Sequence, residues 1–527
     1  MRLRRRLLAA ASALLAGLAG AVVATPAHAV GPALLPVTVT NTTGRSDAVY
    51  LYVIGVQLSS GRLGYVNSGG AFAPWTGGQI PPSPAPDVSI PGPGNGGSTT
   101  IQFPRGFSGR VYFALGQKLK FFLTPDGLVQ PAPWAAGDAN RDILFDWSEF
   151  TYNDSGLWLN SSQVDMFAVP HAVTVTGASG VTRRTGDVVA NGRNAVIDGI
   201  RAQQGWANTV HTRSDGTVLR VLAPGKAAGA GLLSTTYLDS YIASAWNAYT
   251  TRTLTVAPFA DQPAIRYYGR TSGNTMTFTN GSGQVVASFN RPSSASVWGC
   301  DGDLPAPNDQ VVGPISRTLC AALNRGTLGT IDTQPSTNAA DFYRNNPTNQ
   351  YARLIHANMT DGRAYAFAFD DVGGFESLVH DGDPRAAGLV LSPFTGGNPA
   401  TGVPVVSTWN NKCIDVPSSN FVDRAPLQMW NCNNTNAQKW TFSGTALKSQ
   451  NNKCMDVDAG STANGAVVQL YACNGTGAQQ FTLNGAGDLV NLQANKCVDI
   501  KDANGSDGAR LQLWDCVGTA NQKWRRG

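Results

Sequence analysis

Six of the eight cysteines form a regular pattern near the C-terminus, and this pattern constrains the fold more than any other feature. In each of three pairs the two cysteines are 19 positions apart, and the first cysteines of successive pairs are offset by 41 and 43 residues. Such internal repetition predicts three copies of one small structural unit. Each unit would pair its own cysteines and add one aromatic ring to a shared core. The pairs are Cys413 with Cys432, Cys454 with Cys473 and Cys497 with Cys516, and the rings are Trp440, Phe481 and Trp524.

Each unit also repeats a carboxylate, an amide and an aromatic residue in the same order. The pattern Asn-Lys-Cys-x-Asp opens the unit, Gln-x-aromatic-x-Cys follows, and Gln-x-aromatic closes it. A carboxylate that bonds neighbouring hydroxyls, beside a ring that stacks on the apolar face of a sugar, forms a shallow pocket for a neutral sugar. Residues 403–527 closely resemble the ricin-B type β-trefoil lectins, known among secreted hydrolases as carbohydrate-binding module family 13.

The resemblance implies one sugar site in each unit. In the family an Asn before the closing Gln completes the site, and only the third unit keeps this Asn; Ala437 and Ala478 stand there in the other two. We therefore expect sugar binding to be most secure in the third unit. The alternative is a trefoil kept only as a structural appendage. The implied sugar-binding residues are Asp415, Gln428 and Trp430 in the first unit, Asp456, Gln469 and Tyr471 in the second, and Asp499, Gln512, Trp514, Asn521 and Gln522 in the third.

The N-terminus predicts export from the cell. Arg2 and Arg4 to Arg6 precede an apolar run from Leu7 to Val23, and Ala27-His28-Ala29 matches an A-x-A cleavage site. We expect residues 1–29 to be a signal peptide rather than a membrane anchor, and the eight cysteines suit an oxidising compartment. Loss of those four arginines lowers the net charge from +5 to +1. The charge then favours neither nucleic acid nor membrane as a partner.

Composition predicts a mainly β protein with a mixed α/β part. The chain has 59 Gly, 30 Pro and only 14% charged residues, as loop-rich secreted β proteins do. Alternating strand patterns fill residues 30–180, and we expect a sandwich or barrel there. Residues 181–391 show a mixed pattern, and residues 392–402 form a Pro/Gly linker before the trefoil of residues 403–527.

Within the mixed part the pattern predicts both strands and helices. Residues 188–198 and 364–369 are expected to be strands. Helices are expected over residues 235–248, 309–323 and 349–358, with an apolar face on the first. A bridge between Cys300 and Cys320 would tie a turn to the second of these helices. Asp301-Gly302-Asp303 lacks the other ligands of a calcium loop, so we predict no metal there.

The stretch from Asp146 to Asp165 concentrates carboxylates among aromatic residues. Glu149 lies between Trp147 and Phe150, where burial would raise the pKa of its carboxyl. Asn153 to Gly156 is a turn signal, and Asp165 follows within a second apolar run. Two carboxylates that face one groove beside aromatic rings are the minimum apparatus for cleaving a glycosidic bond. The alternative is that the pair is purely structural.

This stretch, with Phe113-Ala114-Leu115-Gly116 before it and Tyr365 to Asp371 after it, resembles glycoside hydrolase family 64. The resemblance implies a secreted endo-β-1,3-glucanase, of which some release laminaripentaose. It implies a thaumatin-like β-barrel or sandwich that forms a wide acidic groove with a mixed α/β domain. Glu149 would be the general acid and Asp165 the general base of an inverting reaction. Cleft-lining positions fall on Thr151, Asn153 and Trp158, and we expect Asp370 and Asp371 to add to the groove.

Two other functions remain possible from the residues. A thaumatin-like protein could bind glucan without cutting it, and a retaining hydrolase could act on another glycan such as xylan. We predict no cofactor, β-1,3-glucan as substrate, cell-wall or other polysaccharide as the partner of the trefoil, and a monomer. His171 beside Pro170 is expected to be structural rather than catalytic.

Overall fold

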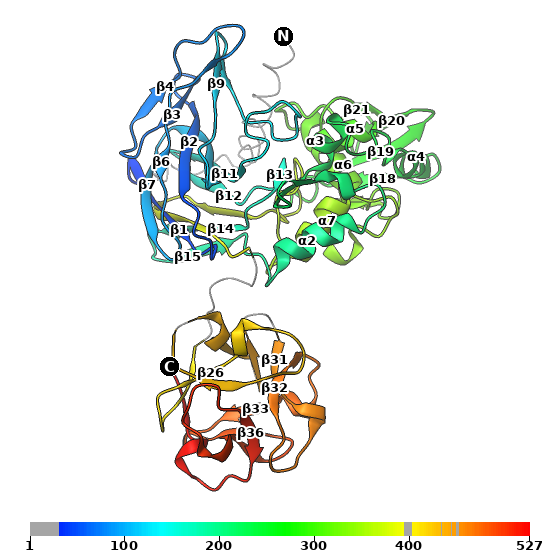
Figure 1. Ribbon diagram of the computed structural model, residues 1–527. Coiled ribbons are helices and arrows are strands. Elements are labelled where there is room, and N and C mark those ends of the chain that lie inside the picture. The colour runs from blue at the N-terminus through cyan, green and yellow to red at the C-terminus, as the bar shows by residue number, and fades with distance from the viewer. Residues whose placement is uncertain (1–30, 395–402, 434, 444, 450–452) are drawn as a thin grey trace. The chain divides into compact units, whose positions relative to one another are not determined.

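The computed structural model describes residues 31–394 and 403–527, apart from residues 434, 444 and 450–452 (Figure 1). The expected signal peptide and most of the expected linker lie outside the described residues. The described chain forms two compact units, one within residues 31–394 and one within residues 403–527. None of the described helices is both long enough and apolar enough to cross a bilayer.

The first unit contains two large sheets packed face to face. Leu35, Val37 and Val39 alternate along one strand and are fully buried in the core between the sheets, as a half-buried strand requires. The strands of the first sheet, in order across it, are β15 (Thr182–Thr185), β14 (His171–Gly177), β24 (Pro384–Leu391), β1 (Leu34–Asn41) and β7 (Ser98–Pro104). Those of the second are β23 (Leu378–Asp381), β12 (Gly156–Asn160), β11 (Leu144–Asn153), β8 (Phe107–Leu115), β2 (Val49–Gln57), β3 (Arg62–Val66) and β4 (Phe72–Pro74), with β6 (Ile90–Pro91) beside β2.

The second sheet has a different core on each face. Phe150 and Tyr152 of β11 point into the core between the sheets. Trp147 points to the opposite face and joins a second core with the helices of the unit, which gather on that side in Figure 1. Because side chains alternate along a strand, Glu149 and Thr151 share the face of Trp147. The expected catalytic acid therefore lies where the sandwich meets the mixed part.

The chain returns to the sandwich after the mixed part, which differs from the boundary expected at residue 180. Strands β15, β23 and β24 all follow residue 180, yet they belong to the two large sheets. Strand β24 lies between β1 and β14, parallel to β1 and antiparallel to β14. A parallel partner more than 300 residues away leaves no local sequence signal, so the pattern along the chain does not predict this pairing.

The mixed part, within residues 188–377, confirms three expected helices and corrects two expected strands. Residues 188–198 instead lead into α2 (Gly192–Arg201), whose Val196, Ile197 and Ile200 form a buried helical stripe. Residues 364–369 instead contain one isolated bridge, from Tyr365 to Ser162, and enter a turn at residue 368, and Phe369 has a left-handed φ of 66° that no regular strand allows. The other helices are α3 (Pro224–Gly229), α4 (Asp239–Ala248), α5 (Ser294–Gly299), α6 (Val312–Arg325) and α7 (Gln350–Ala357).

Three smaller sheets complete the first unit, and the expected bridge between Cys300 and Cys320 is present, linking the end of α5 to α6. One sheet orders β21 (Val285–Asn290), β20 (Thr275–Thr279), β19 (Tyr267–Ser272), β18 (Leu254–Val256) and β22 (Thr333–Gln334). The others are β13 (Met166–Phe167), β17 (Val218–Leu222) and β16 (Val210–Thr212), and β10 (Gly127–Val129), β9 (Phe122–Thr124) and β5 (Ser83–Pro84).

The second unit has the three repeats that the cysteine spacing predicts. All three expected disulfides are present. Trp440, Phe481 and Trp524 are buried in one common core, and the first strand pairs with the last to close the ring of units. The strands are β25 (Val405–Ser407), β26 (Cys413–Asp415), β27 (Ala425–Pro426), β28 (Gln428–Trp430), β29 (Trp440–Ser443), β30 (Ala446–Ser449), β31 (Lys453–Val457), β32 (Val468–Ala472), β33 (Phe481–Leu483), β34 (Leu489–Asn491), β35 (Lys496–Ile500), β36 (Leu511–Trp514) and β37 (Trp524–Arg526).

Candidate active site and sugar-binding sites

Glu149 and Asp165 come together through one arginine. Glu149 on β11 lies directly opposite Arg110 on β8, and Asp165 immediately precedes β13. Arg110 Nη2 is 2.9 Å from Glu149 Oε1 and 3.4 Å from Asp165 Oδ2. Because one nitrogen makes both contacts, these two oxygens are at most about 6.3 Å apart. That limit lies below the roughly 6.5–9.5 Å typical of inverting glycosidases and admits the roughly 5–5.5 Å typical of retaining ones. The structure therefore brings together the two carboxylates that the sequence singled out.

A lysine from the mixed part places a second positive charge beside the carboxylate pair. Lys226, in α3, places its Nζ 3.1 Å from Asp165 Oδ1. The same ammonium lies 4.4 Å from the ring centre of Trp134, and the Arg110 guanidinium lies 4.5 Å from that of Trp147. Each cation is thus held between a carboxylate and an aromatic face. The site draws charged groups from both the sandwich and the helical part.

The two carboxylates have opposite pKa shifts. Burial raises the pKa of Glu149, and the positive charge of Arg110 offsets only part of that effect. Burial would also raise the pKa of Asp165, but the charges of Lys226 and Arg110 together outweigh it and lower the pKa. The side chains are 8% and 13% exposed, respectively, so both border solvent. A protonated carboxyl beside an ionised one is the arrangement of a general acid with a general base.

The other expected cleft residues lie on the strands next to Glu149. Thr151 shares its face of β11, and its hydroxyl is hydrogen-bonded to Ser108 at 2.7 Å. Trp158 on β12 pairs with Thr151, and its ring stacks on His380 at 4.3 Å. Asn153 ends β11 and accepts a hydrogen bond from the Ser155 amide in the expected turn. Contacts of these three residues with substrate remain predictions.

Asp370 does not line the site, which corrects the sequence-based expectation. Its side chain is 0% exposed, and its oxygens accept bonds from Arg325, His356 and the Ala366 amide. A carboxylate so enclosed holds protein segments together instead of meeting a sugar. Asp371 is partly exposed, and burial together with the Asp370 charge raises its pKa. A substrate contact by Asp371 remains a prediction.

Arg110 and Lys226 belong to the site but were not predicted from the sequence. Arg110 stands in an otherwise strand-like, apolar stretch, and a charge at such a position signals a buried ion pair. Lys226 lies in a short helix far along the chain, and its spacing from Asp165 gives no signal. Only the folded chain brings it to the carboxylate.

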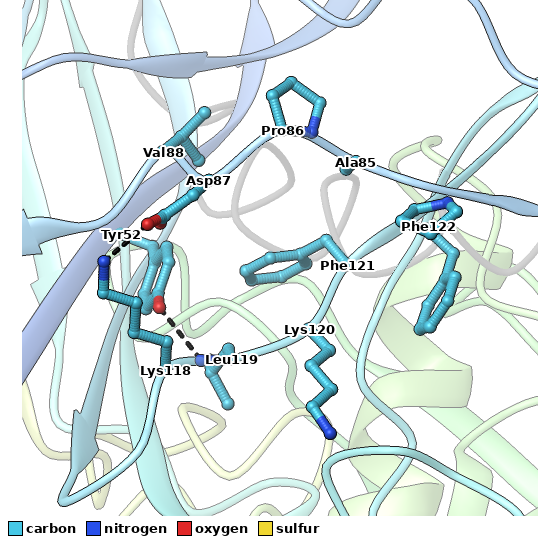
Figure 2. Close-up of a pocket in the computed structure, with 11 residues that line it drawn as sticks. Tyr52, Ala85, Pro86, Asp87, Val88, Lys118, Leu119, Lys120, Phe121 and Phe122 are labelled. Atoms are coloured by element: carbon cyan, nitrogen blue, oxygen red, sulfur yellow. Dashed lines mark hydrogen bonds and ion pairs between the residues drawn. The ribbon is translucent and has the colours of Figure 1, made fainter.

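A separate pocket of about 360 Å³ is lined by residues 84–88, residues 118–122 and Tyr52 (Figure 2). Tyr52 of β2 forms one wall, and its hydroxyl accepts a hydrogen bond from the Leu119 amide at 2.9 Å. Asp87 and Lys118 form an exposed ion pair at its rim. Neither Glu149 nor Asp165 is among its lining residues, and the walls are mostly apolar. The pocket therefore has no part in the acid–base chemistry of the pair.

The sugar-binding residues implied for the trefoil converge on one aspartate in each unit. In the first unit the amides of Gln428 and Gln438 donate to Asp415, and in the second those of Gln469 and Gln479 donate to Asp456. In the third unit Gln512 and Gln522 donate to Asp499, and Asn521 adds a bond of 2.7 Å to Asp499 Oδ2. Trp430 and Trp514 are each 40% exposed, as stacking platforms must be. The third unit has the fullest set.

In each unit, the backbone amide of the residue after the proposed stacking ring donates a hydrogen bond to a neighbouring unit. The amide of Asn431 donates to Asp507 of the third unit, and the amide of Ala472 donates to Asp423 of the first. The amide of Asp515 donates in the same way to Asn464 of the second unit. The three bonds form a closed cycle around the trefoil. Each platform is therefore fixed from a unit other than its own.

Paired carboxylates with opposite pKa shifts on a β sandwich, joined to a trefoil with clustered sugar-site residues, define a glycoside hydrolase with a carbohydrate-binding domain. The chain belongs to glycoside hydrolase family 64. A family model described as β-1,3-glucanase matches residues 33–391, and a model described as ricin-type β-trefoil lectin domain matches residues 402–524. Both sequence resemblances are thereby confirmed.

Relatives and solved structures agree with the assignment. The glucan endo-1,3-β-glucosidases of Arthrobacter sp. (strain YCWD3) and Cellulosimicrobium cellulans are each 45% identical over 458 residues, which cover 83% of this chain and 82% of theirs. A laminaripentaose-producing β-1,3-glucanase, solved with laminaritetraose, is 55% identical, with a TM-score of 0.67 over 69% of this chain and 99% of that one. A β-1,3-glucanase domain from Clostridium beijerinckii is 25% identical, with a TM-score of 0.57 over 70% of this chain and 100% of that one.

Proposed function

We propose that the chain is a secreted endo-β-1,3-glucanase in which Glu149 is the general acid and Asp165 the general base of an inverting reaction. The observation that carries the proposal is the opposite pKa shift of two carboxylates that share Arg110. Family membership and two relatives named glucan endo-1,3-β-glucosidase support the substrate. The four disulfides support an oxidising, extracellular setting.

The reaction needs one proton to be delivered and one to be removed. Glu149, whose protonated form is favoured because burial raises its pKa, donates to the glycosidic oxygen as the bond between that oxygen and the anomeric carbon breaks. Asp165, ionised because Lys226 and Arg110 lower its pKa, accepts a proton from the water that attacks the anomeric carbon. Attack from the face opposite the leaving group inverts the anomeric centre. Exchange with solvent then returns each carboxyl to its starting state.

Arg110 and Lys226 act by setting these protonation states. Both contact Asp165, so their combined charge favours its ionised form. Glu149 contacts only one of the two cations, Arg110, and is more deeply buried than Asp165. Its protonated form is therefore favoured more than the protonated form of Asp165. This asymmetry supports Glu149 as the acid and Asp165 as the base.

The proposal also covers the length of the product and the role of the trefoil. The 55% identical laminaripentaose-producing relative supports laminaripentaose as the main product of this chain. The trefoil would anchor the enzyme to cell-wall or other polysaccharide, and its clustered Asp, Gln and aromatic residues support this role.

Hydrolysis of linear β-1,3-glucan by purified variants tests the catalytic assignment. Loss of a positioned acid or base should lower the rate by about 10²–10⁴, so Glu149→Gln and Asp165→Asn should each lose most activity. Asp154→Asn is the matched control, because that carboxylate lies in the turn after β11 and is 92% exposed. Chromatography of the soluble products gives both the rate and the product length. Activity within a few-fold of wild type in either active-site variant would remove that residue from the mechanism.

The anomeric form of the first product tests the stereochemistry independently. An inverting enzyme must release α-anomeric reducing ends from a β-linked glucan. Proton NMR during the first minutes of hydrolysis should therefore show the α signal before mutarotation. A first β signal would instead assign Asp165 or Glu149 the role of nucleophile in a retaining reaction.

A further inference from the structure

Two equivalent residues of the repeats each lie close to the proposed sugar site of the preceding unit. The residue four positions before the first cysteine of each unit is Trp409, Gln450 or Gln493, and Gln450 lies outside the described residues. Gln493 Nε2 donates to Gly460 O at 3.1 Å, and the same side chain packs directly on Gly477.

These two glycines belong to the site of the second unit. Gly460 ends the short 3₁₀ helix η6 (Asp458–Gly460), which begins two residues after Asp456. Gly477 begins η7 (Gly477–Gln479), next to Ala478, which stands where the third unit has its Asn. Gln493 therefore bridges the two segments that flank the second sugar site.

Trp409 occupies the corresponding place at the third site. The Thr408 amide donates to Lys523 O at 2.9 Å, and Lys523 directly follows η9 (Ala520–Gln522), which contains Asn521. On the other side, a Cβ placed on Gly505 would lie 3.5 Å from Trp409 Cη2, and Gly505 follows η8 (Lys501–Ala503). Trp409 thus lies against the segment after η8, and its neighbour Thr408 is bonded to the segment after η9.

The exposure of Trp409 distinguishes it from the structural tryptophans of the trefoil. Trp440 and Trp524 are buried in the common core, whereas Trp409 is 40% exposed, like the platforms Trp430 and Trp514. An exposed indole at the edge of a sugar site has the apolar face that stacks on a pyranose ring. The third unit therefore carries the exposed indole of Trp514 and has the exposed indole of Trp409 against its Gly505.

We propose that Trp409 is a second stacking platform of the third sugar site, which extends that site from one sugar ring to consecutive rings of a polysaccharide chain. The platform comes from the N-terminal end of the trefoil, and closure of the ring between its first and last strands places it there. The proposal rests on the proposed sugar-binding role of the trefoil. It makes the third site selective for chains over single sugars.

Binding isotherms on insoluble β-1,3-glucan and on xylan test the proposal. The full chain is used with Glu149→Gln to prevent digestion, and the same chain without residues 403–527 gives the retention due to the catalytic unit alone. Trp409→Ala should weaken the remaining polysaccharide binding about two- to tenfold, the worth of one aromatic stacking contact. Trp409→Phe keeps a ring and should restore most of the loss, which a merely structural role for the indole would not allow.

Trp514→Ala separates failure of this proposal from failure of sugar binding as a whole. If Trp514→Ala weakens binding while Trp409→Ala does not, the trefoil binds polysaccharide and Trp409 has no part in it. If neither variant changes retention above that of the catalytic unit alone, the sugar-binding role of this site is itself wrong, and the proposal falls with it. Equal unfolding transitions of the variants would show that the trefoil stays intact.

Discussion

Lys226 Nζ lies 3.1 Å from Asp165 Oδ1, the carboxylate oxygen opposite the one that faces Arg110. Each oxygen of Asp165 thus has its own cation, whereas Glu149 shares Arg110 with Asp165. Two cations stabilise the ionised form of Asp165 despite its burial, and the same burial favours the protonated form of Glu149. The position of Lys226 therefore supports the proposed role of Asp165 as the general base.

The first prediction is that Lys226→Met moves the acid limb of the pH–rate profile. Lys226 helps to lower the pKa of Asp165, so loss of its charge raises that pKa. More Asp165 is then protonated at low pH, and kcat/KM falls there while activity near the upper end of the profile changes less. Because Lys226 is partly exposed, the shift should be at most about one pH unit. Lys226→Arg keeps the charge and should leave the limb in place; movement of the alkaline limb instead would contradict the assignment of Asp165 as base.

The sequence singled out the carboxylate pair that shares Arg110 because the signal of Glu149 is local. Glu149 is flanked by Trp147 and Phe150, and the turn at residues 153–156 separates β11 from β12 as expected. The partners that set the two pKa values come from β8 and α3, and no local pattern connects them to the pair. Asp370 was misassigned for the same reason, since its partner Arg325 is 45 positions away. Composition shows that an acidic residue is present, but only the fold shows whether it is paired.

A second prediction concerns His171 and acid stability. His171 is buried at the start of β14, its Nδ1 lies 2.8 Å from Val169 O, and its ring packs edge-on against Phe113. Burial lowers its pKa to about 4 from 6.5. The stabilisation due to neutral His171 is therefore complete above pH 6.5 and is lost as the pH falls toward 4. Between pH 7 and pH 4.5 this group should remove about 2–3 kcal/mol of unfolding free energy.

Urea unfolding of wild type and His171→Asn at the two pH values measures this contribution. The Asn amide can still donate to the Val169 carbonyl but does not titrate, so the variant should lose less stability than wild type on acidification. His356→Asn is a control of opposite sign. Burial would lower the pKa of His356, but the Asp370 carboxylate outweighs it and raises the pKa, so its contribution is lost as the pH rises. Equal acid sensitivity in wild type and His171→Asn would contradict the prediction.

Fold prediction from sequence succeeded where pattern and contact are both local. The three repeated units followed from the cysteine spacing, because each disulfide closes within its own unit, and the trefoil fold followed from the family resemblance. Residues 188–198 were expected to form a strand because Val, Ala and Ile occur in both strands and helices over a short run. The segment forms a helix because helical spacing buries Val196, Ile197 and Ile200 against other segments. Strand β24 pairs with β1, which lies more than 300 residues earlier in the chain, so no local sequence pattern predicts its place in the sandwich.

The third prediction is that removal of residues 403–527 lowers the rate of hydrolysis of insoluble substrate but not that of soluble substrate. Both proposed catalytic carboxylates and both cores of the first unit lie before residue 395, and the 55% identical solved relative corresponds to 69% of this chain. Hydrolysis of soluble β-1,3-linked oligosaccharides should therefore stay within about twofold of the full chain. Attack on insoluble glucan should fall severalfold, because an anchor raises the local concentration of the enzyme at the polymer surface. Equal rates on insoluble glucan with and without the trefoil would exclude an anchoring role.

The last prediction ranks the sugar sites of the trefoil. Asp499 accepts bonds from Gln512, Gln522 and Asn521, whereas Ala437 and Ala478 cannot supply the third bond in the other units. The extra amide holds Asp499 in position and adds a polar group beside the sugar, so Asp499→Ala should weaken polysaccharide binding more than Asp415→Ala.

Each site contributes a few charge-assisted hydrogen bonds and one stacking contact, so a single variant should be weakened rather than inactive. Retention of the full chain on insoluble β-1,3-glucan and on xylan, in the Glu149→Gln background, measures the ranking. Asp423→Ala is the matched control, because Asp423 holds the backbone beside Tyr471 of the second unit and contacts neither Asp499 nor Asp415. That variant should leave binding at the third site unchanged. Equal losses from Asp499→Ala and Asp415→Ala would show that Asn521 does not strengthen the third site.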